Sequence, residues 1–491
     1  MKIFYWLLLI LLPVTLSAQR DMPLRFELEA AKDADDYNGI PIGEKGFIVF
    51  YEGNLVGQDS SSWVFIQYDT NLKKMAHHAL TMPINLHYVT GEYADDHIYL
   101  VFQENFQRRS VPKTYYVDME LQNFTFQKRE IENLSDQNIS FLRATGQSLV
   151  LISYEKNQYG LYLYDMIRNQ LKNPELTTGQ IVSVEFCEVD TIFSRILWGV
   201  AISSGGKNSY LQLIETDFQG NKTRETNYPS FTDYYYNSTR LTVLDTGLYL
   251  IMGTFTDGND RYKGDMHSGV YTMNYKNAMI EEPQFFHYTH VKSKDTVGDG
   301  KSKDRNSNLQ LSVGPIYRLG DQYALVTEVF YPEYSYNYAG SGYDPYYYGY
   351  NSMPATSTFV GYRYINAYVT AFDRSGNLLW GNYLPFSNIL TQRLTHRVNV
   401  YPLGNSAMIY YLFNSSLTYT MVNGEDVIEP LTTVRLETNH NRDAVEYSRN
   451  PKFEHWYGDY FVAYGYQYIR NNSKGVKSKR YVFFANKLIC K

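Results

Sequence analysis

Short runs of alternating apolar and polar residues, separated by turn residues, follow one another along almost the whole chain. Residues 367–385 show the pattern well: an alternating run ends at Phe372, the turn residues Asp-Arg-Ser-Gly occupy 373–376, and a second alternating run follows. This order predicts a tight antiparallel hairpin. Similar runs at 86–91, 98–104, 115–119 and 124–131 predict four successive strands, here called A to D. The pattern therefore predicts an all-β protein.

The four-strand phrase repeats at regular spacing, with an acidic or amide residue near the end of strand C in each copy. These residues are Asp69, Asp118, Asp165, Asp217, Asn274, Asp373, Glu437 and Asn486. Their spacing is 47 to 64 residues, except for one gap of 99 that holds two extra polar or tyrosine-rich segments. Repeats of about fifty residues with four short strands are typical of β-propeller blades. The sequence predicts a single propeller of eight four-stranded blades, with seven as the alternative.

The eighth repeat, which starts near Asn450, contains strands A to C and then the chain ends. The orphan segment at 24–29, Leu-Arg-Phe-Glu-Leu-Glu, precedes the first repeat and has the alternation of a strand. If it supplied strand D of the eighth blade, it would bury two otherwise open sheet edges. We therefore predict that an N-terminal strand closes the ring.

One repeat also carries a more specific motif. The phrase from Ala371 to Trp380, with an apolar strand, Asp373, Gly376 and a later tryptophan, resembles the blade repeat of quinoprotein-type propellers, and the copy at 217–221 does so in part. The whole chain looks like exported bacterial propeller proteins of uncharacterised function. This resemblance implies the fold and no activity. We expect no bound cofactor, because quinone enzymes of this type would have more regular tryptophans.

The N-terminus has the features of a secretory signal peptide. A charged start at Lys2, an apolar run over 3–16 and the small residues Ser17 and Ala18 predict a signal over residues 1–18, followed by a propeller domain over 19–491. The position after the expected cleavage site is Gln19 rather than cysteine, which argues against a lipoprotein. We therefore expect an exported protein, periplasmic or extracellular, with no membrane span after signal removal.

Composition excludes some classes of function. The 49 tyrosines and 26 phenylalanines favour strands, and the net charge of -6 is spread along the chain, so no nucleic-acid-binding face is predicted. The only cysteines, Cys187 and Cys490, lie in distant repeats, and we predict two unpaired thiols with Cys187 buried in a strand. No metal-ligand set with suitable spacing is present.

The long connections fall on one side of the expected scaffold. In a propeller, the B-to-C and D-to-A connections emerge on the same face, and the predicted insertions are all of these two kinds: 105–113, 228–240, 257–268, 292–308, 331–364 and 470–479. Because such scaffolds tolerate insertions at their binding face, this face is the predicted functional surface.

Two groups of side chains are predicted on this surface. The first is aromatic: Tyr234, Tyr235, Tyr236, Tyr331, Tyr334, Tyr336, Tyr338, Tyr343, Tyr346, Tyr347, Tyr348 and Tyr350. Tyrosine offers contact area at low entropic cost, which suits protein partners and sugars, although a glycine-spaced loop could also pack on itself. The second consists of strand-B glutamates, namely Glu52, Glu104, Glu155 and Glu328. They could bind a cation or a basic partner, or they could simply satisfy the next turn.

The absence of a complete catalytic set favours a non-enzymatic binding or scaffold protein, which presents its tyrosine-rich face to an envelope, outer-membrane or secreted protein. The alternative is a propeller that binds or cleaves a glycan, using stacked tyrosines and rim glutamates. The sequence does not identify the partner.

Overall fold

Antiparallel strands are the main elements of the computed structural model. It describes residues 24–489 except 33–35, 106–111, 135–138, 146, 156–157, 175, 178, 204–208, 259–267, 289–308, 338–355, 405, 441 and 474. Over these residues the elements form eight sheets, together with the short 3-10 helix η1 (Gly43–Lys45). No helix in the described part of the chain has the length and apolar character needed to span a bilayer.

Each sheet is a run of strands consecutive in the chain, apart from the eighth. The first sheet contains β2 (Tyr37–Pro41), β3 (Phe47–Leu55), β4 (Ser60–Tyr68) and β5 (Lys74–Pro83). The second contains β6 (Leu86–Ala94), β7 (His97–Glu104), β8 (Thr114–Glu120) and β9 (Thr125–Glu130). The third contains β10 (Ile139–Ala144), β11 (Ser148–Glu155), β12 (Gln158–Asp165) and β13 (Gln170–Lys172). The fourth contains β14 (Ile181–Asp190), β15 (Arg195–Ser203), β16 (Ser209–Asp217) and β17 (Lys222–Asn227).

The remaining sheets follow the same order. The fifth contains β18 (Tyr234–Asp245), β19 (Leu248–Asp257), β20 (Gly269–Lys276), β21 (Met279–Ile280) and β22 (Gln284–His287), the last two both pairing with β20. The sixth contains β23 (Gln310–Leu319), β24 (Gln322–Asn337), β25 (Thr356–Phe372) and β26 (Leu378–Thr391). The seventh contains β27 (Asn399–Leu403), β28 (Ser406–Phe413), β29 (Ser416–Asn423) and β30 (Asp426–Arg435). The eighth contains β31 (Ala444–Tyr457), β32 (Tyr460–Arg470), β33 (Lys479–Ile489) and β1 (Arg25–Glu29).

This strand order is that of an eight-bladed β-propeller, which confirms the predicted all-β fold and the count of eight blades. The eighth sheet confirms the predicted role of the N-terminal segment, since β1 pairs with β33 in the register Arg25 opposite Asn486 and Glu29 opposite Val482. The chain divides into two compact units. The smaller comprises Met1–Val49, Ile66–Ala76 and Arg435–Lys491, and the larger comprises Phe50–Phe65 and His77–Val434. The prediction of one domain over 19–491 stays a prediction.

Several of the predicted turn residues act through their carboxylates. Asp69, Asp165, Asp217 and Asp373 each end a strand and accept hydrogen bonds from main-chain N–H groups two to four residues later, at 2.8 to 2.9 Å. Such bonds stabilise a turn without help from the rest of the fold. Asp118, Asn274 and Asn486 lie near the end of the third strand of their sheets, as predicted, but inside the strand rather than in the turn that follows it. Glu437 is wrong, because it follows β30, the fourth strand of its sheet, whereas the third strand β29 ends at Asn423.

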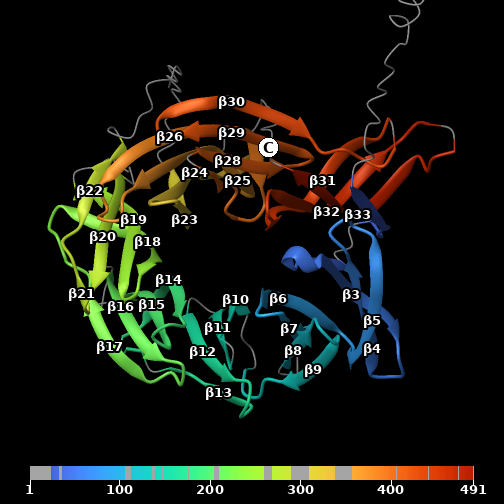
Figure 1. Ribbon diagram of the computed structural model, residues 1–491, viewed down its shortest axis with the longest axis horizontal. Helices are drawn as coiled ribbons and strands as arrows, with labels where there is room; N and C mark the ends of the chain where they lie inside the picture. The colour runs from blue at the N-terminus through green and yellow to red at the C-terminus, as the bar shows by residue number, and fades with distance from the viewer. Residues whose placement is uncertain are drawn as a thin grey trace, which may run out of the picture. The chain divides into compact units, whose positions relative to one another are not determined.

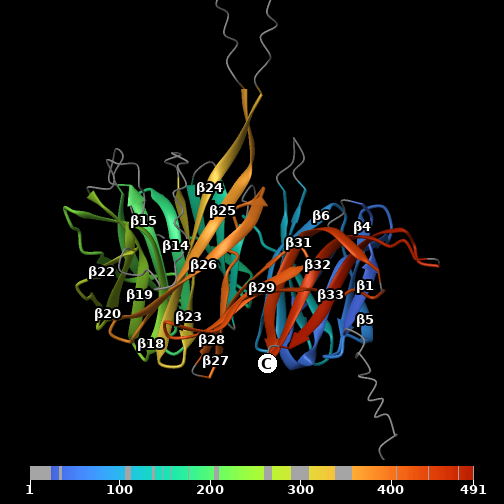
Figure 2. The ribbon, with the colours of Figure 1, turned by 90° about the horizontal axis from the view of Figure 1, so that it is seen from above.

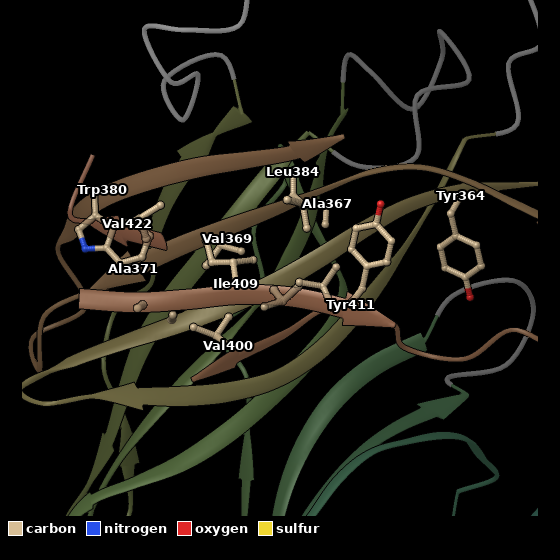
Figure 3. Close-up of a cluster of buried hydrophobic side chains, with 14 of the residues drawn as sticks. Tyr364, Ala367, Val369, Ala371, Trp380, Leu384, Val400, Ile409, Tyr411 and Val422 are labelled. Atoms are coloured by element: carbon tan, nitrogen blue, oxygen red, sulfur yellow. The ribbon is translucent and has the colours of Figure 1, made fainter. Parts of the chain in front are cut away.

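The core of the larger unit lies between successive sheets. Figure 1 shows the sheets from β6 to β30 following one another in chain order. Between the sixth and seventh sheets, Ala367, Val369 and Trp380 pack against Ile409 and Val422 (Figure 3). Trp380, the tryptophan of the quinoprotein-like phrase, is buried and donates its indole N–H to Oε1 of Gln322 at 2.8 Å. Cys187 is a buried free thiol in β14, as predicted, and Cys490 lies outside the described residues.

Three glutamates link one sheet of the larger unit to the segment that begins the next. The side chain of Glu92 (β6) accepts a hydrogen bond from the Ala144 N–H of β10 at 2.8 Å, and that of Glu185 (β14) accepts one from the Thr239 N–H of β18 at 3.2 Å. Glu328 (β24) accepts hydrogen bonds from the N–H groups of Arg397 and Val398, the two residues before β27. Apolar packing between sheets has no preferred direction, so these directional bonds fix how the sheets align.

Charged side chains on β1 hold this strand against β32 and β33 in the smaller unit. The guanidinium of Arg25 is fully buried and bonds to Oε1 of Glu27 at 2.8 Å, Oε1 of Gln467 at 2.7 Å and Oδ1 of Asn486 at 2.5 Å. Arg480 completes the cluster by pairing with Glu27 at 3.3 Å. The cluster therefore connects β1 to both β32 and β33.

The Arg25→Ala variant should destabilise the protein by about 3 kcal/mol, because truncating one partner of a buried charge pair leaves the others unsatisfied. The matched control is Glu29→Ala on the same strand, whose partner Lys477 and own side chain are mostly exposed, and it should not change unfolding measurably. Urea unfolding followed by circular dichroism measures both. Equal midpoints for the two variants would contradict a fastening role for Arg25.

Candidate functional site

The described part of the tyrosine-rich insertion is a two-stranded ribbon rather than a loop. β23 pairs with β24 only as far as Phe330, and β26 pairs with β25 only from Tyr362 onward. Beyond these points β24 and β25 continue paired with each other alone, through residues 331–337 and 356–361. We call these residues, together with Tyr362 and Arg363 at their base, the ribbon. Figure 2 shows it projecting past the neighbouring strands of the larger unit. The prediction of a loop over 331–364 was wrong for these residues, since strand pairing continues into the insertion.

One face of the ribbon is aromatic. Alternation along β24 places Phe330, Pro332 and Tyr334 on the same side, opposite Tyr364, Tyr362 and Phe359 of β25. The rings form a continuous series of contacts: Phe330 to Tyr362 at 5.7 Å, Tyr362 to Phe359 at 5.1 Å and Phe359 to Tyr334 at 5.7 Å between centroids. We call Pro332, Tyr334, Phe359 and Tyr362 the aromatic face.

A β-bulge at Val360 makes this face continuous. Glu333 pairs with Gly361 and Tyr334 pairs with Phe359, so Val360 is the extra residue on β25. Without it, strict alternation from Tyr362 would turn Phe359 to the opposite side. The bulge therefore redirects the Phe359 ring onto the face that carries Tyr334.

The opposite side of the ribbon is polar. Arg363 donates from Nε to Oε2 of Glu333 across the two strands, and the hydrogen bond from the guanidinium holds the pKa of the Glu333 carboxyl below its usual value. Ser335 donates its hydroxyl to the carbonyl of Thr358 at 3.4 Å. The ribbon is thus amphipathic, with one side able to contact an apolar surface and the other stable in water.

Exposure rises along the aromatic face from base to tip. Phe330 is only 2% exposed, whereas Tyr334 and Phe359 are 45% and 42% exposed. At the base, the Tyr364 hydroxyl accepts a hydrogen bond from the Thr395 N–H at 3.0 Å and donates one to the Thr395 carbonyl at 2.6 Å. Tyr364 also belongs to the core cluster between the sixth and seventh sheets (Figure 3). The ribbon is therefore anchored in the core and open to solvent at its tip.

The predicted tyrosines are distributed unevenly. Tyr331 is half-buried on the polar side of the ribbon, Tyr334 lies on the aromatic face, and Tyr336 pairs with Ser357 in the strand register. Tyr338, Tyr343, Tyr346, Tyr347, Tyr348 and Tyr350 lie outside the described residues.

The group at 234–236 begins β18 instead of lying in the predicted loop. Tyr234 stacks on Phe285 with centroids 4.3 Å apart, and Tyr236 contacts Tyr271 at 4.7 Å. Both are partly buried against the core cluster of the fifth sheet, and burial raises the pKa of the Tyr236 hydroxyl. Only Tyr235 is exposed, at 41%. The alternation of β18 explains the difference, since it turns every second tyrosine inward.

The predicted strand-end glutamates have different environments. Glu52 is exposed on β3, and the side chain of Glu155 is not among those the structure describes. Glu104 ends β7 and accepts a hydrogen bond from the Lys113 N–H at 3.1 Å, which satisfies the start of the next strand. Glu328 lies inside β24 and is completely buried, so it is not a rim residue.

Glu328 has an unusual set of partners. Its Oε1 atom accepts the main-chain N–H groups of Arg397 at 2.6 Å and Val398 at 2.5 Å, and it lies 3.3 Å from Nδ1 of His396. Among the described residues, no hydrogen-bond partner with good geometry is found for its other oxygen or for the ring nitrogens of His396, all of which are buried. Burial raises the pKa of Glu328 to about 7 and lowers the pKa of His396 to about 4. At neutral pH the His396 ring is therefore uncharged, and the Glu328 carboxyl is partly protonated.

Sequence reasoning missed Phe359, Tyr362 and His396. The apolar alternation at 330, 332 and 334 in β24 could have suggested the aromatic face, but the bulge that adds Phe359 has no local signal. His396 is 68 residues from Glu328 in the chain, so only the fold brings them together.

A pocket of about 310 Å³ lies elsewhere in the larger unit, next to Tyr159, Asn173 and Thr177, and none of the candidate residues lines it. Within the described ranges no group of three or more His, Cys, Asp or Glu side chains is arranged to hold a metal ion. The candidate functional site is therefore the ribbon and its base.

The Tyr364→Phe variant should lower the free energy of unfolding by about 1 kcal/mol, since it removes the two hydrogen bonds that join the buried Tyr364 ring to the main chain of Thr395. The control is Tyr334→Phe, which removes the same atom from an exposed ring of the same ribbon and should have little effect. Thermal unfolding of both variants measures the difference. A Tyr364→Phe protein as stable as the wild type would show that Tyr364 does not anchor the ribbon.

Several solved structures are similar to this chain, at TM-scores below 0.5, and neither the fold nor the function is argued from them. No protein-family model and no curated protein matches the chain. Among solved structures, it is similar to the β-propeller domain of the Trilobed protease from Pyrococcus furiosus, with 9% identity, coverage of 82% of this chain and 93% of that one, and a TM-score of 0.37. It is also similar to the polysaccharide lyase Uly1, with 8% identity, coverage of 93% and 100%, and a TM-score of 0.41. It spans about half of the Pyrococcus horikoshii acylaminoacyl peptidase, with 8% identity, coverage of 80% and 52%, and a TM-score of 0.37. At these values no activity carries over, and the propeller assignment stands on the chain's own strand order.

Proposed function

We propose that this chain is an exported, non-enzymatic binding protein that presents the aromatic face of its ribbon to a protein partner in the envelope or outside the cell. The observation that carries the proposal is the series of contacting rings that ends in two half-exposed aromatic side chains, Tyr334 and Phe359. Export is inferred from the signal-like residues 1–18.

The exposed rings have the properties of a contact site. Aromatic side chains lose little conformational entropy on binding, and each ring here is already held by its neighbour. Exposed apolar groups that lie next to one another on a polar protein usually mark an interaction surface. The Glu333–Arg363 pair on the other side keeps the ribbon amphipathic, so the aromatic side is the one available for an apolar partner.

The ring geometry favours a protein over a sugar. The planes of Tyr334 and Phe359 meet at 65°, and those of Phe359 and Tyr362 at 67°. Sugars stack on an open, flat ring face, whereas these rings present a stepped surface of edges and faces suited to side chains of a protein. Two of the strand-B glutamates are also engaged elsewhere, since Glu104 bonds to the start of its own next strand and Glu328 is buried.

The test is capture of partners from envelope extracts by the purified chain, compared with the double variant Tyr334→Ser, Phe359→Ser. A captured protein should bind the double variant roughly thirtyfold more weakly, since two central aromatic contacts are lost. Its unfolding should change little because both rings are about half exposed and lie outside the buried core cluster. The matched control is Tyr210→Ser in β16, where the ring is 42% exposed but lies outside the ribbon. Equal capture by the double variant and the control would contradict the proposal.

A glycan array with the same three proteins tests the alternative. Saturable binding of a polysaccharide that disappears in the double variant would replace the protein partner by a sugar. Binding that survives in the double variant would exclude the ribbon as the site.

A further inference from the structure

The ribbon has two strand edges that are open in the described part of the chain. β23 stops pairing with β24 at Phe330, and β26 stops pairing with β25 at Tyr362. Among the described residues, 331–337 and 356–361 therefore have a strand neighbour on one side only. In an antiparallel ladder every second residue points its N–H and C=O away from its neighbour. Each edge thus presents main-chain groups that a further strand could bond.

The two edges differ in how well they are protected against further pairing. The β24 edge contains Pro332, which has no N–H to donate, and the charged Glu333. Proline and charge are the features that natural proteins place on edge strands to prevent the addition of another strand. The β25 edge at 356–361, with the sequence Thr-Ser-Thr-Phe-Val-Gly, contains neither. Its threonine, phenylalanine and valine residues favour strand pairing, so this is the edge on which a further strand can be added.

Two other edge strands of the larger unit show the usual protection. β9 ends with Lys-Arg-Glu in a strand of six residues, and three of the six residues of β17 are also charged. Both strands are outermost in their sheets. The lack of charge at 356–361 therefore sets the ribbon apart from these two strands.

The position beside 356–361 continues the line of β26. That strand ends at Thr391, where the chain bends and the Thr391 hydroxyl donates to the Arg393 carbonyl at 2.8 Å. Gly361 lies against this end, since a Cβ there would be 2.7 Å from the Thr391 carbonyl oxygen. A strand added beyond Gly361 would therefore extend the sixth sheet in the row that β26 occupies.

We propose that the partner adds an extended segment as a new strand to the open edge of β25 at 356–361, with apolar side chains at every second position lying against the aromatic face. The inference rests on the proposed function and deepens it by naming the chemistry of the partner segment.

The two sides of the ribbon determine the pattern of that segment. Tyr334 and Phe359 are half exposed on one side, and Glu333 pairs with Arg363 on the other. Side chains of neighbouring strands that point to the same side lie about 5 Å apart, close enough to touch. An added strand would therefore need apolar residues beside the rings and polar residues between them.

The size of the edge favours a peptide segment over a second copy of the chain. Six strand residues span about 20 Å. A stable dimer usually buries about 800 Å² on each partner, which an edge of this length cannot supply by itself. A single extended segment can instead gain affinity from main-chain hydrogen bonds together with a few side-chain contacts.

The position of Pro332 predicts which main-chain groups the segment would bond. A proline fits a strand where its nitrogen faces away from the neighbouring strand, so Pro332 should face the outer edge of β24. Tyr334 and Tyr336, two and four residues later, should face the same way. Their partners in the register are Phe359 and Ser357. The N–H groups of these two β25 residues should therefore face the open edge.

The test uses a phage library of random peptides of about twelve residues, selected on the full chain and counter-selected on the Tyr334→Ser, Phe359→Ser double variant. Selected peptides should have apolar residues at every second position. N-methylation of the peptide, one residue at a time, should weaken binding roughly tenfold at alternate positions, because each of these loses a main-chain hydrogen bond to β25.

Ser357→Pro tests the edge from the side of the protein. It removes an N–H that should face the open edge, and it should weaken peptide binding roughly tenfold without changing the thermal unfolding midpoint. Ser357→Ala is the matched control, because it loses the same side chain but keeps the N–H, and it should bind as the wild type does.

Failure to select a peptide, N-methylation effects that do not alternate, or equal binding by Ser357→Pro and Ser357→Ala would each overturn the proposal. Slow amide hydrogen exchange at 357 and 359 in the free chain would overturn it too, because another part of the chain or a second copy would already fill the edge. None of these results affects a protein captured by the wild type and lost with the double variant. Failure of the inference is therefore distinct from failure of the proposed function.

Discussion

The larger unit depends on buried or partly buried glutamates that accept main-chain N–H groups from the next sheet. Apolar cores between sheets supply most of the free energy but allow neighbouring sheets to slide, because packing has little directional preference. A carboxylate bonded to a fixed N–H removes that freedom. The links start from Glu92, Glu185 and Glu328, and they end at Ala144, at Thr239, and at Arg397 with Val398. In the first two links, Arg143 also pairs with Glu92 and Arg240 also pairs with Glu185. Each arginine is next in the chain to the residue whose N–H is bonded, and it reduces the cost of burying the carboxylate charge.

The third link differs from the other two in a way that matters for the ribbon. No arginine side chain bonds to the Glu328 carboxyl among the described residues, and His396 occupies the neighbouring position. The charge is therefore less compensated, which is why burial raises the pKa of Glu328 to about 7. The same kind of link is therefore paired with an arginine in two places and not in the third, which lies next to Thr395, the residue that bonds to Tyr364.

The sequence predicts the parts of this fold that local interactions determine. Alternation gives the strands, and Asp69 and Asp373 stabilise their turns with atoms only a few residues away. The pairing of β1 with β33 was predictable too, because the eighth repeat has only three strands in the sequence and the segment at 24–29 belongs to no repeat. The site is only partly predictable. Glu328 was identified by its place near a strand end, but its contact with His396 depends on the fold, and the aromatic face depends on the bulge at Val360, which only the strand register shows.

The exposed tip of the ribbon cannot be stable by itself. An isolated pair of strands is marginal in water, so the order of Tyr334 and Phe359 must come from the residues below them. That support passes through Tyr362 to Phe330, which is buried, and through Tyr364 to Thr395. Among the described residues, the ring contacts of Tyr334 and Phe359 therefore lead back to the base. A change in how residues 395–398 hold the base must alter the order of the aromatic face, and with it the entropy that a partner has to overcome on binding.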